Sequence, residues 1–308
     1  MRYLTVRQDD RQRVDNFLLR ELKGLPRSRI YQMLRKGEVR VNGGRVKPTH
    51  RLAVGDQVRI PPVHGLPGAG ADAPAFIGDA VLGTLEEAVV FEDEDLLVIN
   101  KPAGMPVHGG SGLAFGAIEA LRRLRPGTDL ELVHRLDRDT SGCLLVAKSR
   151  SRLLELHRAL REREVKKDYS LIVLGLWPRR TTTVQLPLKR YLTASGERRV
   201  RVADDGKPSR TDFEIRERGA AATLLSARLH TGRTHQIRVH ACATGHPVAG
   251  DVKYSSPRQQ GAVAACGVHR LCLHAAELVV VIGGRKHRFS APLPADLIAA
   301  WEALGSVG

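Results

Sequence analysis

The stretch ELVHRLDRDTSGCLLVAKS, residues 131–149, places a dense group of charged side chains directly before an apolar segment. His134, Arg135, Asp137, Arg138 and Asp139 lie within six positions, and the run GCLLVA that follows is typical of a buried strand. A solvated, salt-bridged turn would explain these charges, and so would a functional loop at the mouth of a sheet. Other features of the sequence are needed to choose between a solvated turn and a functional loop.

The composition predicts a globular protein with one large core or two domains. The chain has 308 residues, of which 42% are hydrophobic. Its first residues are charged and its apolar runs are short, so we expect a cytoplasmic protein with no membrane association. We also expect a monomer. Four cysteines in a chain of this length do not form a disulfide scaffold.

The charge balance indicates a polyanionic partner. The chain has 49 Lys and Arg against 33 Asp and Glu, a formal net charge of +16, and nucleic acid is the commonest partner of such a surplus. The charge is also segregated: residues 1–64 carry +9, residues 65–100 carry −8 and the remainder carries +15. This distribution favours two basic bodies separated by an acidic stretch.

Residues 12–64 read as a small module of two helices and a short sheet. Apolar residues recur at helical spacing from Val14, a second helix is expected from Ser28, and VNGG at 41–44 is a hairpin turn signal. The polar faces of the helices carry four basic residues that we expect to contact phosphates: Arg27, Arg29, Arg35 and Lys36. Residues 65–85 are expected to form a flexible linker, because they begin with a stretch rich in Gly, Ala and Pro.

Residues 86–308 predict one larger α+β domain. Apolar strand-like runs recur with interspersed helices, but strands and helices do not alternate as they would in a doubly wound parallel sheet. We therefore expect a mixed, largely antiparallel sheet.

The surroundings of Asp137 favour an ionised carboxylate. Arg135 and Arg138 flank it and His134 lies nearby. Such a group suits a nucleophile, or an electrostatic stabiliser of a cationic sugar carbon, better than a general acid. Asp139 raises the alternative of a glycosidase-like pair of carboxylates. Because one member of that pair must stay protonated, we instead expect Asp139 to cap the following turn.

The segment TGRTHQIRVH, residues 231–240, gathers Arg233, His235, Arg238 and His240 at an expected helix start, which could be a solvated basic helix or a site for a phosphate or a carboxylate. Thr231 or Thr234 could cap this helix, and Arg233 in the tight turn is the expected partner of a buried aspartate. Tyr169 begins a strand after two lysines, where it could stack on a base or simply belong to the core.

Zinc is an alternative that the sequence leaves open. Cysteine and histidine, the usual ligands of tetrahedral zinc, recur late in the chain, although no C-x-x-C pair is present. The candidate ligands are Cys242, His246, Cys266, His269, Cys272 and His274.

Several motifs together resemble the RluA-like pseudouridine synthases. They are NKPAGMPVHGG, HRLDRDTSGCLLVAKS, KKDYSLIVLG, TGRTHQIRVHACATGHPVAGD and LCLHA, in this order along the chain. The first module resembles the αL-type RNA-binding domain of ribosomal protein S4. The resemblance covers nearly the whole chain except the linker and residues 255–265.

This resemblance implies an enzyme that converts uridine to pseudouridine in large-subunit (23S) ribosomal RNA or in an assembling large subunit, without cofactor or metal. Asp137 would be the catalytic aspartate, Tyr169 would stack on the flipped uracil, and Arg233 would pair with Asp137. Arg135 would fill the space that the base leaves, beside His134, and Leu273 would line the pocket. Two alternatives to this function are a non-catalytic RNA-binding or ribosome assembly factor and a pseudouridine synthase that acts on another RNA.

Overall fold

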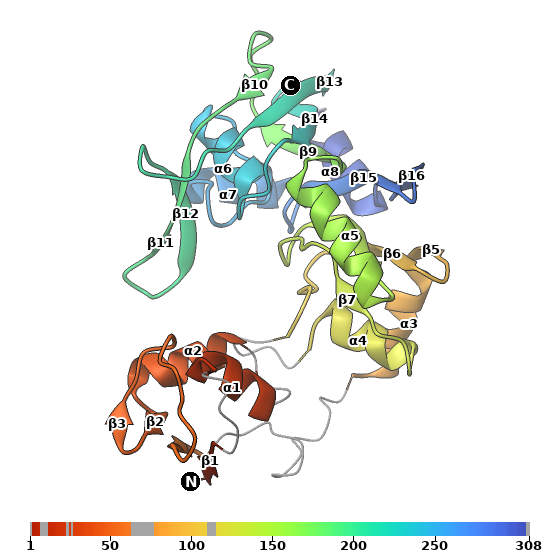
Figure 1. Ribbon diagram of the computed structural model, residues 1–308. Helices are drawn as coiled ribbons and strands as arrows, with labels where there is room; N and C mark the ends of the chain where they lie inside the picture. Colours follow the sequence, from red (N-terminus) through yellow and green to blue (C-terminus); the bar gives the residue numbers. More distant parts are fainter. Residues whose placement is uncertain are drawn as a thin grey trace. The chain divides into compact units, whose positions relative to one another are not determined.

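The protein divides into two compact units. The structure is a computed structural model that describes residues 2–6, 12–22, 25, 27–62, 77–109 and 115–305. One unit lies within residues 1–76 and the other within residues 77–308 (Figure 1). The predicted boundary falls in the same part of the chain, and each unit has its own hydrophobic core.

The first unit packs two helices against a four-stranded sheet with the order β1-β4-β2-β3. Its elements are β1 (Arg2–Thr5), α1 (Val14–Glu21), α2 (Arg27–Lys36), β2 (Arg40–Val41), β3 (Gly44–Arg45) and β4 (Gln57–Ile60). Asn42 and Gly43 take positive φ angles of 49° and 80°, as the predicted hairpin turn requires. β1 lies before the predicted start at residue 12 and pairs with β4, so the sheet of this unit also includes residues 2–5.

The second unit is built on a mixed sheet with the strand order β10-β13-β14-β9-β15-β8-β6-β5, to which β16 adds beside β15 and β7 beside β8. All of its pairs are antiparallel except β8 with β15, so the predicted mixed sheet is confirmed. The strands are β5 (Val89–Glu92), β6 (Leu96–Lys101), β7 (Glu131–Leu132), β8 (Ser141–Ala147), β9 (Lys166–Leu174), β10 (Thr183–Val184), β13 (Thr211–Arg218), β14 (Ala222–Leu229), β15 (Leu273–Ile282) and β16 (Arg285–Ser290). A separate two-stranded hairpin consists of β11 (Leu188–Leu192) and β12 (Arg198–Val202).

In the described residues of this unit, six helices accompany the sheet: α3 (Asp79–Glu87), α4 (Ala117–Leu124), α5 (Arg150–Arg161), α6 (Gln236–Ala243), α7 (Pro257–Ala265) and α8 (Ala295–Gly305). α3 overlaps the C-terminal end of the predicted linker 65–85, so residues 79–85 are helical. Leu85 of α3 is fully buried in the core of the second unit. Residues 63–76 lie outside the described residues. No helix in the described ranges is long and apolar enough to cross a membrane.

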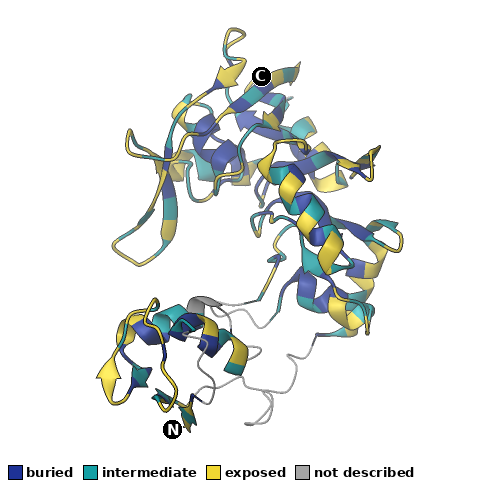
Figure 2. Ribbon diagram, viewed as in Figure 1, coloured by how far each residue is buried: buried dark blue, intermediate teal, exposed yellow. Residues whose placement is uncertain are grey.

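The interior strand β8 is buried along its whole length, so its alternate residues serve two cores. Leu144 and Val146 belong to the larger cluster, which includes residues of α4 and α6. Cys143 and Leu145 belong to the other, which includes Leu153 of α5. α5 contacts β8 and carries both buried and exposed residues (Figure 2). The position of β8 between two cores of the second unit gives the loop before it a rigid base.

The parallel junction of β8 and β15 requires a glycine at position 142. The strands meet at His274 opposite Ser141 and Ala275 opposite Gly142. Gly142 has a φ of 110°, and a Cβ atom there would lie 2.3 Å from the carbonyl oxygen of Ala275. No side chain fits this approach of two backbones.

We predict that Gly142→Ala lowers the free energy of unfolding of the second unit by more than about 3 kcal/mol, since backbone must move to admit the methyl group. Gly127→Ala is the matched control, because Gly127 also has a positive φ (83°) but has open space around its Cα. It should cost only about 1–2 kcal/mol of backbone strain. Urea unfolding followed by tryptophan fluorescence measures this unit alone, because both tryptophans, Trp177 and Trp301, belong to it. Equal losses in the two variants would contradict the steric explanation.

Candidate active site

Asp137 stands in the loop between β7 and β8, at the edge of a cavity of about 250 Å³. Its side chain is 20% exposed, so the carboxylate is open to the cavity but largely shielded. The loop is short and enters the buried strand β8 at Ser141, which fixes its base. The cavity is lined by His134, Arg135, Leu136, Asp137, Thr140, Lys167, Tyr169, Arg190, Leu229, Gly232, Arg233, Thr234, His235, Gln236, Ile237, Arg238 and Leu273.

A buried guanidinium pairs with Asp137. Nη1 of Arg238 lies 3.4 Å from Oδ2 of Asp137, and the Arg238 side chain is only 3% exposed. The fully buried Asp251 accepts two bonds of 2.7 Å from Nε and Nη2 of the same guanidinium. These carboxylates raise the pKa of Arg238 although burial opposes it. The guanidinium is therefore a fixed positive charge beside Asp137.

His235 is the second group that faces Asp137. Its Nε2 lies 3.8 Å from the same Oδ2, and its side chain is 12% exposed. Burial lowers the pKa of His235, while the Asp137 carboxylate opposes that shift. On its other side, Nδ1 of His235 lies 2.6 Å from the hydroxyl of Tyr254.

The predicted ion pair between Arg233 and Asp137 is wrong, because the arginine that pairs with Asp137 is Arg238. Arg233 is exposed, and its Nε donates a 3.2 Å hydrogen bond to the carbonyl of Pro208. α6 begins only at Gln236 after His235 adopts a left-handed conformation (φ 53°), so Arg238, on the first turn, points inward. Neither Thr231 nor Thr234 caps this helix, because His235 occupies the N-cap position. Arg233 still lines the cavity.

Tyr169 and Leu273 form adjoining walls of the cavity from neighbouring strands. Tyr169 in β9 is 7% exposed and Leu273 in β15 is 4% exposed, and both also belong to the main core. Burial, and then the charge of Asp137, raise the pKa of the Tyr169 phenol above its ordinary value. The phenol therefore keeps its proton at neutral pH. Tyr169 therefore belongs to the core and lines the cavity at the same time.

His134 and Arg135 lie side by side in the chain but differ in surroundings. The backbone N–H of Leu145 donates a 3.1 Å bond to Nε2 of His134, and burial holds the pKa of this imidazole at about 3. His134 is thus a neutral anchor of the loop to β8. Arg135 is exposed at the rim of the cavity.

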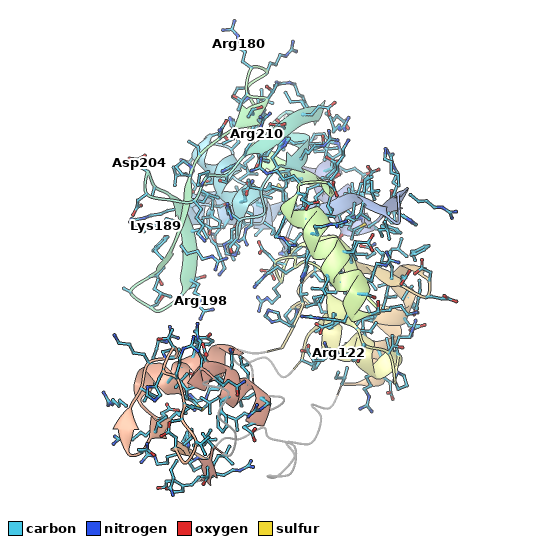
Figure 3. The ribbon with its side chains drawn as sticks, in the orientation of Figure 1. Arg122, Arg180, Lys189, Arg198, Asp204 and Arg210 are labelled. Carbon is cyan, nitrogen blue, oxygen red and sulfur yellow. The ribbon has the colours of Figure 1, made fainter. Side chains whose placement is uncertain are left out.

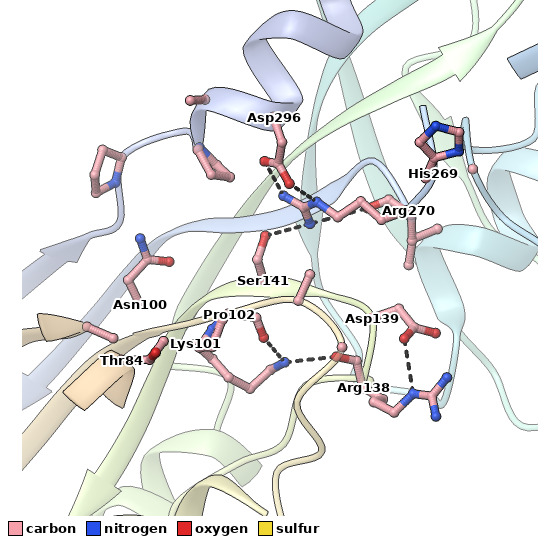
Figure 4. A pocket seen from close by; sticks show the side chains of 18 of the residues that line it. Thr84, Asn100, Lys101, Pro102, Arg138, Asp139, Ser141, His269, Arg270 and Asp296 are labelled. Carbon is pink, nitrogen blue, oxygen red and sulfur yellow. Dashed lines mark hydrogen bonds and ion pairs between the residues drawn. The ribbon is translucent and has the colours of Figure 1, made fainter. Parts of the chain in front are cut away.

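A second, larger cavity of about 1130 Å³ lies against the other part of the loop (Figure 4). Asp139 lines it, and its carboxylate accepts a 3.1 Å bond from Nε of Arg138. The structure does not bear out the predicted turn cap by Asp139, since the backbone N–H of Thr140 bonds instead to the carbonyl of Asp137. Asp137 and Asp139 line different cavities, an arrangement that does not support a carboxylate pair across one site.

Lys101 is a buried anchor of this loop. The residue is 0% exposed, and its Nζ donates to the carbonyls of Pro102 (2.8 Å), Met105 (2.8 Å) and Arg138 (3.0 Å). Burial lowers the pKa of Lys101 to about 7, whereas the three acceptors match the three N–H donors of the ammonium form. Ser141 is also held by Nη1 of Arg270 (Figure 4), and its hydroxyl contacts Nδ1 of His274.

The proposed zinc ligands do not gather. No group of three or more His, Cys, Asp or Glu side chains that could hold a metal ion occurs among the residues that the structure describes. The candidates bond within the fold instead: the Cys242 thiol donates to the carbonyl of Tyr254, and His274 bridges Ser141 and the carbonyl of Ala291. Cys143 and Cys272 are buried, and burial raises the pKa of the Cys143 thiol to about 11.

The basic residues predicted in the first unit are not equivalent. Arg35 and Lys36 are exposed at the end of α2. Arg29 forms a 2.9 Å ion pair with Glu38, an acidic partner that the sequence interpretation overlooked. The side chain of Arg27 lies outside the described part of the chain.

Sequence reasoning named His235 and Arg238 in a basic cluster that could bind a phosphate or a carboxylate, but it did not pair either of them with Asp137. It assigned no role to Lys101, Asp251 or Tyr254. Lys101 and Asp251 lie inside the quoted motifs NKPAGMPVHGG and TGRTHQIRVHACATGHPVAGD, so their residue types were visible but the directions of their side chains were not. Tyr254 lies three positions after the second motif, and no sequence signal singled it out.

Two family models match the chain. The model described as RNA pseudouridylate synthase matches residues 95–243, which include the Asp137 loop, Tyr169 and α6. The model described as S4 domain matches residues 12–58 in the first unit.

Curated relatives match over most of their length. "Ribosomal large subunit pseudouridine synthase C" of Yersinia pestis is 52% identical over 277 residues, which cover 89% of this chain and 86% of the relative. The protein of the same name from Escherichia coli K12 is 52% identical over 270 residues, covering 87% and 84%. Among solved structures, human RNA Pseudouridylate Synthase Domain Containing 1 matches with a TM-score of 0.58 and 28% identity, covering 67% of this chain and 82% of that chain.

We predict that Lys101→Met lowers both stability and turnover. Three buried carbonyls lose their donor, which should cost about 3 kcal/mol or more, and the loop that carries Asp137 loosens. Lys148→Met is the control, because Nζ of Lys148 binds Glu92 and the carbonyl of Asp93 instead of the loop. Single-turnover rates at a temperature where both variants are folded should fall only for Lys101→Met. An unchanged rate would contradict the role of Lys101 in holding the loop.

Proposed function

The chain belongs to the RluA-like family of RNA pseudouridine synthases, and from this premise we propose that it isomerises uridines of large-subunit (23S) ribosomal RNA with Asp137 as the reacting carboxylate. The names of the relatives support the choice of RNA. The observation that carries the assignment of Asp137 is its position in a shielded cavity beside the buried guanidinium of Arg238.

The reaction breaks the C1′–N1 bond of a uridine, turns the base, and joins C1′ to C5. C5 loses a proton and N1 gains one, so the product is an isomer and no cofactor is required. An ionised carboxylate beside C1′ can attack that carbon or remove the 2′ proton. The contact with Arg238 supports both routes equally, because it holds the carboxylate in place beside a fixed positive charge.

The remaining walls fit a base that has left the RNA stack. Tyr169 offers an aromatic face and a phenol that keeps its proton, which suits stacking and hydrogen-bond donation better than proton abstraction. Leu273 offers an apolar side. Arg135 at the rim is exposed and could fill the space that the flipped base leaves, at a site where flipping costs a few kcal/mol. These assignments are supported by position in the cavity.

We further propose that the RNA backbone follows a basic groove that opens beside the uridine cavity. This groove of about 510 Å³ contains Arg161, Arg163, Lys166, Lys167, Arg228, His230 and Arg233. Within the described part of the chain, the structure pairs only Arg228, with Asp168, and His230, with Asp212, to carboxylates. Lys167, Gly232 and Arg233 line both the groove and the uridine cavity. In this proposal the role of Arg233 is phosphate binding.

Arg35 and Lys36 of the first unit would add phosphate contacts of their own, as RNA-binding S4 domains require. We propose that the enzyme acts as a monomer. A ribosomal RNA substrate supports action in the cytoplasm.

We predict that Asp137→Asn lowers the rate of pseudouridine formation by roughly 10⁴-fold or more, because the amide is neither a nucleophile nor a base. RNA affinity should change little, since phosphate contacts supply most of the binding. Asp139→Asn is the matched control and should keep near-normal activity. Release of tritium from RNA labelled at C5 of uridine measures the reaction. Persistent activity in Asp137→Asn would falsify the assignment, and an inactive Asp139→Asn would restore the two-carboxylate mechanism.

The groove makes a quantitative prediction about salt dependence. Each lost phosphate contact lowers the slope of log affinity against log salt by about 0.7–0.9, so Arg161→Gln with Lys166→Gln should lower it by roughly 1.4–1.8. The control is Arg179→Gln with Arg180→Gln, two exposed arginines on the loop between β9 and β10. Figure 3 labels Arg180 on this loop. Filter binding to a ribosomal RNA fragment over a salt series gives both slopes. Equal slopes for the two double variants would place the RNA backbone elsewhere.

A further inference from the structure

The turn after α6 holds both groups that face Asp137. Asp251 receives the two bonds from Arg238, and its Oδ1 also accepts the backbone N–H groups of Lys253 (2.9 Å) and Tyr254 (3.2 Å). Tyr254 in turn contacts His235 through its hydroxyl and lies under Arg238, whose guanidinium carbon is 5.2 Å from the centre of the ring. One turn therefore sets the positions of the guanidinium and the imidazole together.

The hydrogen bonds around Tyr254 determine which nitrogen of His235 carries the proton. The Tyr254 oxygen accepts a 3.1 Å bond from the backbone N–H of Val200. Its own proton points to Nδ1 of His235, 2.6 Å away, because burial raises the pKa of this phenol to about 12 and the group stays protonated. Nδ1 is then an acceptor, and the proton of the neutral imidazole resides on Nε2. The opposite tautomer would turn a lone pair toward the Asp137 carboxylate.

The backbone of His235 is also unusual. The residue has φ 53° and ψ 23°, a left-handed backbone conformation that few residues other than glycine adopt. Its side chain makes no hydrogen bond that caps α6. A residue held in such a conformation at the edge of a site indicates a constraint other than helix capping. Here the conformation directs the imidazole between Tyr254 and Asp137.

We propose that His235 is a positioning residue for Asp137: its Nε2–H donates to Oδ2 of the carboxylate, and Tyr254 fixes the tautomer that makes this possible. The inference rests on the proposed role of Asp137. Both Arg238 and His235 approach Oδ2, so Oδ1 is left to face the sugar of the substrate. The separation of 3.8 Å closes to a hydrogen bond when RNA fills the cavity, as contacts of catalytic groups commonly do on substrate binding.

A neutral donor at this position has a chemical advantage over a second cation. Asp251 already offsets the charge of Arg238, so the carboxylate of Asp137 meets one compensated guanidinium and one neutral N–H. The carboxylate is oriented on two sides and yet keeps the basicity or nucleophilicity that either route to pseudouridine requires.

Two amide substitutions test the position of the donor. The amide nitrogen of His235→Gln reaches the place of Nε2, whereas that of His235→Asn reaches only the place of Nδ1. We expect His235→Gln to retain activity within a few-fold of wild type and His235→Asn to lose roughly 10-fold or more in the single-turnover rate, with RNA affinity unchanged in both. Asparagine tolerates the left-handed conformation well, so loss of fold does not explain the difference. Equal rates in the two variants would overturn the proposal.

Tyr254→Phe tests the tautomer, since it keeps the ring under Arg238 and removes only the hydroxyl. In the wild-type protein, imidazole nitrogen NMR should show the His235 proton on Nε2, with the signal identified by its loss in His235→Gln. In Tyr254→Phe both tautomers should be populated and the rate should fall several-fold, while the same change added to His235→Gln should cost less. A proton on Nδ1 in wild type would overturn the proposal. Activity in Asp137→Asn would instead refute the role of Asp137, so the two failures are distinguishable.

Discussion

The ion pair of Arg238 with Asp251 and Asp137 is the interaction on which the site depends. A guanidinium that is 3% exposed costs several kcal/mol in lost hydration unless charged partners surround it. Asp251 supplies two of these contacts and Asp137 the third. Because the partners come from α6, from the turn after it and from the loop before β8, the same electrostatic requirement brings three distant segments of the chain together.

The sheet supplies the rigid base for this requirement. β8 and β15 meet in parallel at Ser141 and His274, and Gly142 allows their backbones to approach. Lys101 anchors the loop by donating a hydrogen bond to the backbone carbonyl of Arg138. The carboxylate of Asp137 can therefore be placed accurately although it belongs to a loop, since both ends of that loop are fixed to buried structure.

The sequence predicted which residue types form this site better than it predicted where their side chains point. The charge around Asp137 and the apolar run after it indicated a loop at a strand, and the mixed sheet followed from the order of the runs. Which of Arg233 and Arg238 pairs with Asp137 depends on where α6 begins. The left-handed conformation of His235 sets that beginning, and hydrophobic periodicity does not reveal such a conformation. β1 and α3 were missed because each is short and lies beside a stretch of loop composition.

The distribution of charge explains how a protein with a net charge of +16 can keep an anionic reactive group effective. A surplus of cations next to Asp137 would bind RNA but would also stabilise the carboxylate in its resting state and weaken its attack. The structure separates the two needs. In the described residues of the basic groove only Arg228 and His230 pair with carboxylates, whereas at Asp137 the guanidinium is shared with Asp251 and burial lowers the pKa of the His235 imidazole. In the proposed mechanism, phosphate binding and the chemistry of the uridine therefore use different electrostatic environments. Arg233 belongs to the first and Arg238, five positions later in the same motif, belongs to the second.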